Sequence, residues 1–122
     1  MEMKKLLESF NHAINGIIDA VRTQRNMKIH IVAAIGVLIA CFFFDISKAE
    51  FLSLAITITM VISAELVNTA VEAAVDLNTN YYHPLAKVAK NTAAGAVLVT
   101  AINALLVGYI VFWDKLSNFS YE

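Results

Sequence analysis

Two glutamates, Glu65 and Glu72, lie in a largely apolar stretch of this sequence. Seven residues make two turns of an α-helix, so the two carboxylates share a helix face and are separated by about 10.5 Å along the axis. Further polar side chains recur on or near that face: Asn68, Thr69 and Asp76. A carboxylate within a spanning helix costs roughly 2.5–3.5 kcal/mol, so a pair of them indicates a function. Such a polar face could hold a cation, bind a polar substrate or move a proton.

The composition is that of a membrane protein. The chain has 122 residues, 59% of them hydrophobic, whereas soluble domains usually contain about 45–50% apolar residues. The excess is concentrated in three blocks, and neither 51–63 nor 92–113 contains a charged residue. We therefore expect one all-α integral membrane domain over residues 1–122. A nucleic-acid partner is not expected, because no dense basic face is present, and the single Cys41 excludes an intrachain disulfide.

Helical periodicity divides the chain into an amphipathic segment and three spans. Residues 1–28 form the amphipathic segment, in which apolar side chains recur at helical spacing, as is typical of a helix lying in the membrane interface. They lack the continuous apolar core and small-residue cleavage site of a signal peptide. We predict the three spans at about residues 29–45, 50–77 and 92–113. Lys28 and His30 are expected to anchor the start of the first span at the interface.

Local signals mark the ends of the predicted helices. Ser47 is a suitable N-cap for the second span, and Pro84, the only proline, is suited to the first position of a helix that continues into the third span. The small residues around Gly95 favour close helix packing in lipid. Tyr109 and Trp113 are expected at the opposite membrane interface.

The distribution of basic residues predicts the orientation. Two lysines, Lys48 and Lys115, fall on one side of the membrane. Seven basic residues fall on the other: Lys4, Lys5, Arg22, Arg25, Lys28, Lys87 and Lys90. Because basic residues accumulate in cytoplasmic segments, the N-terminus and the second loop are expected to be cytoplasmic. The polar face, the second loop and the amphipathic segment then meet at one interface.

Carboxylates beside basic residues suggest that a polyanion is held through a divalent metal. Mg²⁺ takes oxygen ligands and is readily shared with phosphates, lysine supplies a point charge to phosphate, and a second carboxylate can take a proton from a hydroxyl. Phosphoryl transfer relies mainly on positioning and charge stabilisation. The four glycines are scattered singly, which excludes a P-loop or a protein kinase. Two alternatives remain open: a polar seam that holds an oligomer together, and a small proton-coupled transporter.

Four segments resemble the prokaryotic diacylglycerol kinase family. The first reads Glu-Leu-Val-Asn-Thr-Ala-Val-Glu-x-x-Val-Asp, and the resemblance covers nearly the whole chain. The His-Pro form of the second loop and the Arg-Asn-x-x-Ile-His segment resemble the Gram-positive branch, whose members are mainly undecaprenol kinases. The four segments are residues 64–76, 82–90, 93–97 and 25–30.

The resemblance implies a homotrimer of three-span protomers in the bacterial cytoplasmic membrane, each with an amphipathic surface helix. Such an enzyme uses Mg²⁺ and ATP to phosphorylate a membrane lipid alcohol, and its sites may combine residues of neighbouring protomers. Undecaprenol is the expected acceptor and diacylglycerol the second choice. A catalytically weakened relative that binds nucleotide or lipid is the competing interpretation.

The same resemblance assigns roles to the polar face. Glu65 would be the general base on the lipid hydroxyl, and Glu72 would hold the metal that bridges the ATP phosphates. Asn68 and Asp76 would position and support these two carboxylates.

The resemblance also places residues around the nucleotide. Lys90 would contact phosphate, Tyr82 and His83 would flank the nucleotide, and His12 on the surface helix would help to hold it.

Two positions depart from the family pattern. Gln24 stands where the family usually has a glutamate that is the second metal ligand, and Asn91 stands where it usually has an aspartate after Lys90. Each replaces a carboxylate by its amide. A glutamine carbonyl can still bind Mg²⁺, more weakly, and Asn91 can accept a hydrogen bond but cannot neutralise a cation.

Overall fold

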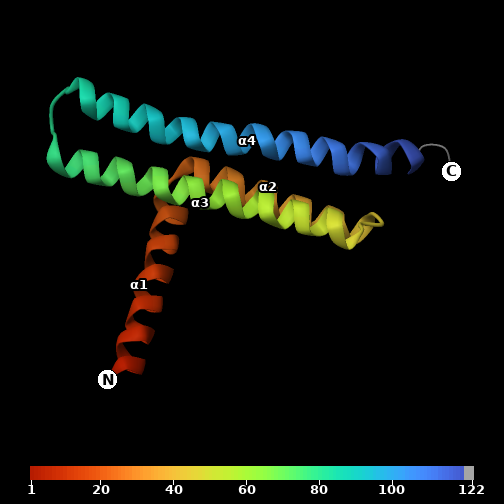
Figure 1. Ribbon diagram of the computed structural model, residues 1–122, viewed down its shortest axis with the longest axis horizontal. Helices are drawn as coiled ribbons and strands as arrows, with labels where there is room; N and C mark the ends of the chain where they lie inside the picture. Colours follow the sequence, from red (N-terminus) through yellow and green to blue (C-terminus); the bar gives the residue numbers. More distant parts are fainter. Residues whose placement is uncertain (120–122) are drawn as a thin grey trace.

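The computed structural model describes residues 1–119, which form four helices and contain no strand. Three of the helices are long and apolar enough to cross a membrane, so the predictions of an all-α chain and of three spans are confirmed. The spanning helices lie beside one another, and the first helix projects away from them (Figure 1). The helices are α1 (Glu2–Thr23), α2 (Arg25–Phe43), α3 (Lys48–Asn78) and α4 (Pro84–Phe119).

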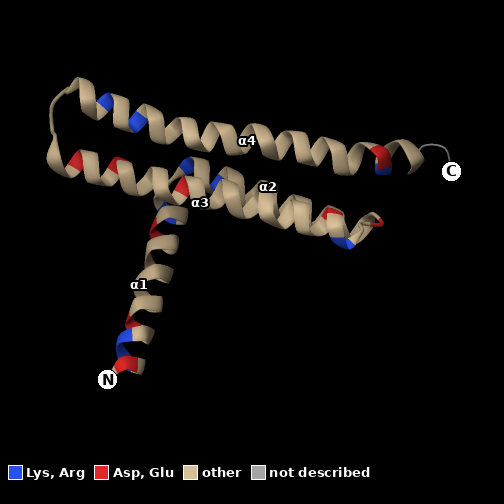
Figure 2. Ribbon diagram, in the orientation of Figure 1, with Lys and Arg blue, Asp and Glu red and all other residues tan. Residues whose placement is uncertain are grey.

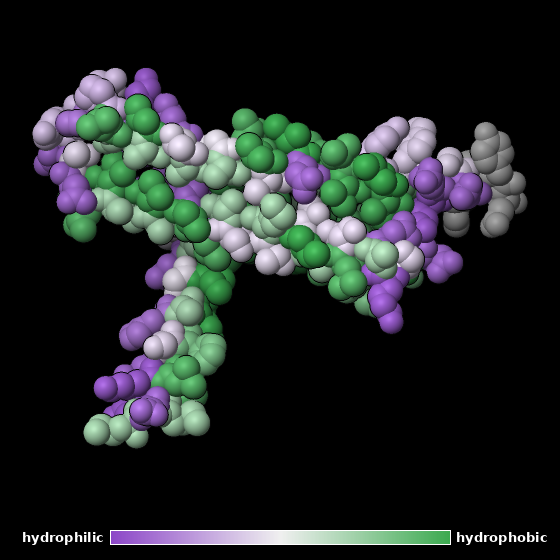
Figure 3. All heavy atoms as spheres, viewed as in Figure 1, coloured by the Kyte–Doolittle hydropathy of each residue, from purple (hydrophilic) through white to green (hydrophobic). Residues whose placement is uncertain are grey.

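Helix α1 is separated from α2 by one residue. Gln24 has an extended backbone (φ −103°, ψ 117°) and ends one helix and begins the next. Ala20 and Met27 are buried on either side of this bend, so the change of direction is packed rather than open. Figure 3 shows hydrophobic side chains along one side of α1 and hydrophilic ones along the other, which is the arrangement that an interfacial helix requires.

The antiparallel pair of α3 and α4 forms the centre of the structure (Figure 1). The buried side chains of α3 are three or four residues apart, so they form one continuous stripe. Apolar residues fill the part nearest the start of α3, and polar residues continue the same stripe towards its end. The stripe consists of Leu54, Thr57, Val61, Glu65 and Asn68.

Local contacts fix the helix ends where the sequence predicts them. Ser47 caps α3: its hydroxyl accepts from the Glu50 backbone N–H, and the Glu50 carboxylate accepts from the Ser47 backbone N–H, both at 3.1 Å. Pro84 is the first residue of α4, and the Leu85 N–H donates to His83 Nδ1 at 3.1 Å. The predictions for Ser47 and Pro84 are therefore confirmed.

The end of the bundle formed by the start of α3 and the end of α4 is closed by polar and aromatic contacts. Lys115 Nζ lies 3.0 Å from Glu50 Oε1, which joins α4 to the first turn of α3. Phe44 packs edge-on against Phe112, with ring centroids 5.8 Å apart, and so holds the end of α2 against α4. These contacts fix the register of the three spanning helices at this end.

Candidate active site

Glu65 is the most deeply buried charged residue among those described. It is 2% exposed, and its Oε2 atom has no hydrogen-bond partner. His30 of α2 is the nearest basic side chain with a contact to Glu65: its Nε2 lies 3.9 Å from Oε2, within ion-pair range but longer than a hydrogen bond. A buried carboxylate oxygen without a donor is costly, so this atom is poised to accept a proton or a hydrogen bond.

Asn68 and Glu72 continue the stripe one and two turns beyond Glu65. Asn68 Nδ2 donates to Glu72 Oε1 at 3.5 Å, so the amide nitrogen is committed to the second carboxylate. Asn68 Oδ1 remains buried and without a partner. The Thr69 hydroxyl donates to the backbone carbonyl of Glu65 at 2.8 Å, so this hydroxyl is bound to the backbone of α3. Two buried oxygens on one face therefore remain free to bind a hydroxyl or a cation.

Exposure increases along the stripe towards the end of α3. Glu65 is buried and Glu72 half-buried, whereas the Asp76 side chain is 64% exposed. Asp76 forms an ion pair with Lys90 of α4. Chemistry at the buried end would be sheltered from water, and the exposed end is open to a charged soluble ligand.

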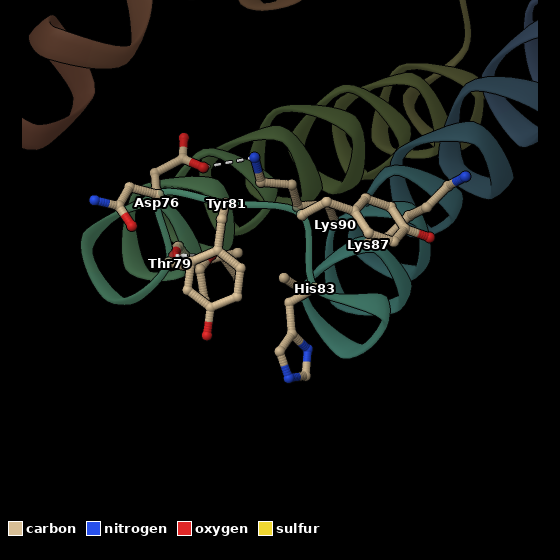
Figure 4. A pocket seen from close by; sticks show the side chains of 10 residues that line it. Asp76, Thr79, Tyr81, His83, Lys87 and Lys90 are labelled. Atoms are coloured by element: carbon tan, nitrogen blue, oxygen red, sulfur yellow. Dashed lines mark hydrogen bonds and ion pairs between the residues drawn. The ribbon is translucent and has the colours of Figure 1, made fainter.

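A cleft of about 730 Å³ lies beyond this ion pair, where the connection between α3 and α4 folds over. Figure 4 shows the Asp76–Lys90 pair on one side and the side chains of Tyr81 and His83 on the other. Aromatic, cationic and hydroxyl groups together are suited to a ring bearing phosphates. The lining includes Asp76, Thr79, Tyr81, Tyr82, His83, Lys87 and Lys90.

Four of the predicted nucleotide or metal residues lie outside this cleft: Glu72, which belongs to the polar stripe, and His12, Asn91 and Gln24. His12 is exposed on α1, Asn91 is exposed on α4, and Gln24 lies at the bend between α1 and α2, where its Nε2 donates to Thr23 Oγ1 at 3.3 Å. Among residues 1–119, no three His, Cys, Asp or Glu side chains are grouped as a metal site. A metal at Glu72 would need other oxygen donors, such as an amide carbonyl or a phosphate.

The helix lengths place the polar stripe relative to a bilayer. Helix α2 has 19 residues, or ~28 Å, close to the ~30 Å hydrocarbon thickness. The His30–Glu65 contact aligns the beginning of α2 with Glu65. Beyond Glu65, α3 continues to Asn78, which adds ~20 Å of helix. Figure 2 shows charged residues around the junction of α1 and α2 and at both ends of the α3–α4 pair.

Three contacts were not apparent from the sequence. His30 was expected only as an interfacial anchor, but its side chain is 19% exposed and lies against Glu65. His83 was expected only beside a nucleotide, but it also caps α4. The Asp76–Lys90 pair joins two residues 14 positions apart. The position of His83 directly before Pro84 was a usable signal for this cap. When proline is the first residue of a helix, the residue before it occupies the N-cap position, from which a side chain can accept a hydrogen bond from the first turn.

Comparison with known proteins identifies relatives of the chain. Residues 11–112 match the family described as Prokaryotic diacylglycerol kinase. The chain is 44% identical over 115 residues to an undecaprenol kinase of Bacillus subtilis (strain 168), covering 94% of both proteins. It is also 44% identical over 104 residues to a diacylglycerol kinase of Synechocystis, covering 84% of this chain and 59% of that protein. A diacylglycerol kinase of Escherichia coli (strain K12) is 32% identical over 80 residues, covering 66% of this chain and 65% of the relative.

Proposed function

The chain belongs to the prokaryotic diacylglycerol kinase family and is a membrane lipid kinase, and from this premise we propose that it transfers the γ-phosphate of ATP to undecaprenol. The similarity to the Bacillus undecaprenol kinase extends over 94% of both chains, which favours this acceptor. Diacylglycerol is the alternative acceptor, because relatives named for it match the chain less completely.

The proposal depends on one observation, the buried and unpartnered Oε2 of Glu65. A hydroxyl that reaches this atom donates a hydrogen bond that the carboxylate otherwise lacks. As the hydroxyl oxygen attacks the γ-phosphorus, Glu65 takes the proton, and the bond between the γ-phosphorus and the β–γ bridging oxygen breaks to release ADP. A positioned general base of this kind contributes typically about 10²–10⁴-fold to the rate.

The helix lengths support this assignment. If α1 lies in the cytoplasmic membrane surface, the His30–Glu65 contact, five residues into α2, sets Glu65 about 8 Å below that surface, within reach of the hydroxyl of a lipid alcohol. Glu72 and Asp76 follow at ~10 Å and ~16 Å further along α3, on the aqueous side. In this proposal the part of α3 beyond Glu65 lies on the aqueous side of the hydrocarbon, so Glu72 and Asp76 are not exposed to lipid.

The metal is proposed to lie at Glu72. The half-buried carboxylate is held by Asn68, and the free Oδ1 of Asn68 adds an oxygen to the set that a hard cation prefers. Bound Mg²⁺ would neutralise charge on the ATP phosphates. Gln24 would be a second ligand through its side-chain carbonyl, since its amide nitrogen already donates to Thr23.

The nucleotide is proposed to occupy the cleft beside Asp76 and Lys90. Phosphate would replace Asp76 as the partner of Lys90, whereas Tyr82 and His83 would flank the base. His12 and Asn91 are exposed outside the cleft, so in this proposal they reach the nucleotide only from α1 or from a neighbouring protomer.

A homotrimer is proposed as the working form. A Cβ added at Gly95 would meet no atom within 4 Å, so the small face of α4 is not used within the chain and is available to a neighbour. Neighbouring helices would also cover the exposed flank of the polar stripe and supply further metal or nucleotide ligands. We place the trimer in the bacterial cytoplasmic membrane with the N-terminus on the cytoplasmic side, in agreement with the excess of basic residues there.

A catalytically weakened enzyme is the alternative, because Gln24 and Asn91 each lack the negative charge of the family's carboxylate. The test is transfer of labelled γ-phosphate from Mg-ATP to undecaprenol and to diacylglycerol, in parallel with Asn91→Asp. Faster labelling of undecaprenol by the chain as it stands supports the proposal. Faster labelling of diacylglycerol overturns the choice of acceptor. Activity that appears only in Asn91→Asp favours the weakened form.

A further inference from the structure

The structure gives His30 a position that the proposed chemistry does not yet use. Its Nε2 lies 3.9 Å from Oε2 of Glu65, and this is the only ion-pair contact of Glu65 among the described residues. The two residues come from different helices, α2 and α3, and the His30 side chain is only 19% exposed. His30 is therefore packed against the carboxylate and is not extended towards lipid head groups.

His30 also lines an apolar cavity. Its volume is about 270 Å³, and it lies among α2, α3 and α4. Among the described residues, His30 is the only one with an ionisable side chain in this lining, which also includes Val37, Val61, Ala104 and Gly108. The imidazole is thus shared between a mostly apolar space and the contact with the buried carboxylate of Glu65.

We propose that His30 is the positioning residue of Glu65: its Nε2–H holds the carboxylate in one orientation. This inference rests on the proposed function, in which Glu65 is the general base. A small rotation of either side chain would bring 3.9 Å to hydrogen-bond distance. A base that is buried and has no fixed donor would sample several rotamers, and few of them would face the attacking hydroxyl.

The proposal predicts that kcat depends on the N–H donor of His30 and not on the presence of a ring at this position. His30→Phe keeps a ring against the cavity and removes the donor. His30→Gln keeps an N–H near the position of Nε2. We expect kcat to fall about 10- to 100-fold in His30→Phe, the range for one hydrogen bond to a charged group. His30→Gln should keep kcat within about fivefold of the original, and the KM for ATP should be unchanged in both, because the nucleotide cleft lies beyond Asp76.

Val37→Ala is the matched control. Val37 lines the same cavity two turns further along α2, and its side chain has no hydrogen-bond donor. A change in the cavity alone should therefore leave kcat unchanged in Val37→Ala. The three variants are compared in detergent micelles by phosphate transfer, with Mg-ATP-dependent thermal stabilisation as the measure of a folded, nucleotide-binding protein.

The outcomes separate this inference from the proposed function. A fall in kcat in His30→Phe with recovery in His30→Gln supports it. Unchanged kcat in His30→Phe, or equal loss in His30→Gln, overturns it. Loss of folded protein in His30→Phe also overturns it, because the polar contact of His30 would then be structural. If the unmodified chain phosphorylates no lipid alcohol, or if Glu65→Gln stays active, the proposed function itself fails, and this is seen before any His30 variant is compared.

Discussion

Replacing Glu65 by glutamine should separate activity from stability. The two side chains have nearly the same shape, so Glu65→Gln removes the charge and the proton acceptor and leaves packing intact. Glu65 is 2% exposed, and one of its oxygens has no partner. An unpaired buried polar group costs about 1–3 kcal/mol, and more when it is charged. The variant should therefore be more stable by about 1–3 kcal/mol, and kcat should fall about 10²–10⁴-fold with the base removed.

Both quantities can be measured on the same preparation in detergent micelles. Initial rates of phosphate transfer give kcat, and thermal denaturation without nucleotide gives stability. Glu8→Gln is the control, because Glu8 is exposed on α1 and its replacement should change stability by less than about 0.5 kcal/mol. A variant that keeps more than a tenth of kcat would refute the assignment of Glu65 as the base. A variant that is less stable than the original would show that the contact with His30 compensates the cost of burying the Glu65 charge.

Three further substitutions test separate features of the structure. Ser47→Ala removes the capping box of α3 and should lower the free energy of unfolding by about 1 kcal/mol, with kcat unchanged, as read by thermal denaturation and phosphate transfer. His83→Ala should cost about 1 kcal/mol through loss of the cap, whereas His83→Asn should retain stability; a raised KM for ATP in both would reveal a nucleotide contact. Gln24→Glu should lower the Mg²⁺ concentration needed for half-maximal rate, and Glu72→Gln should raise it, because a carboxylate binds Mg²⁺ more strongly than an amide does. If this concentration in a variant equals that of the unmodified chain, the substituted residue is not a Mg²⁺ ligand.

Features that depend on neighbouring residues in the sequence could be predicted without the structure. The Ser47 cap requires only a serine three residues before Glu50, and Pro84 can begin a helix because its missing N–H is not needed there. The shared face of Glu65 and Asn68 follows from helical spacing alone. Hydropathy likewise located three spans, although it could not mark where helix leaves the bilayer.

Features that depend on helix register could not be predicted. The His30–Glu65 contact joins positions on α2 and α3, and it depends on the short connection between these two helices, residues 44–47. A one-residue change in this connection would rotate the facing side chains by about 100°. The exposure of Asp76 and its ion pair with Lys90 depend in the same way on the length of the connection between α3 and α4.

The difference in length between α2 and α3 explains how one helix face can serve two substrates that occupy different phases. Helix α2 is only long enough to cross the hydrocarbon, and its contact through His30 fixes Glu65 about 8 Å along α2 from its first residue. Because α3 continues beyond that level, the same face that is apolar at Val61 becomes polar at Asn68 and exposed at Asp76. A lipid hydroxyl could reach the buried end without leaving the membrane, and a nucleotide could reach the exposed end without entering it. In the proposed mechanism the lipid hydroxyl and the γ-phosphate meet within the two turns of α3 between Glu65 and Glu72, ~10 Å along the helix axis, so each substrate would solvate the carboxylate at its own end of the polar stripe.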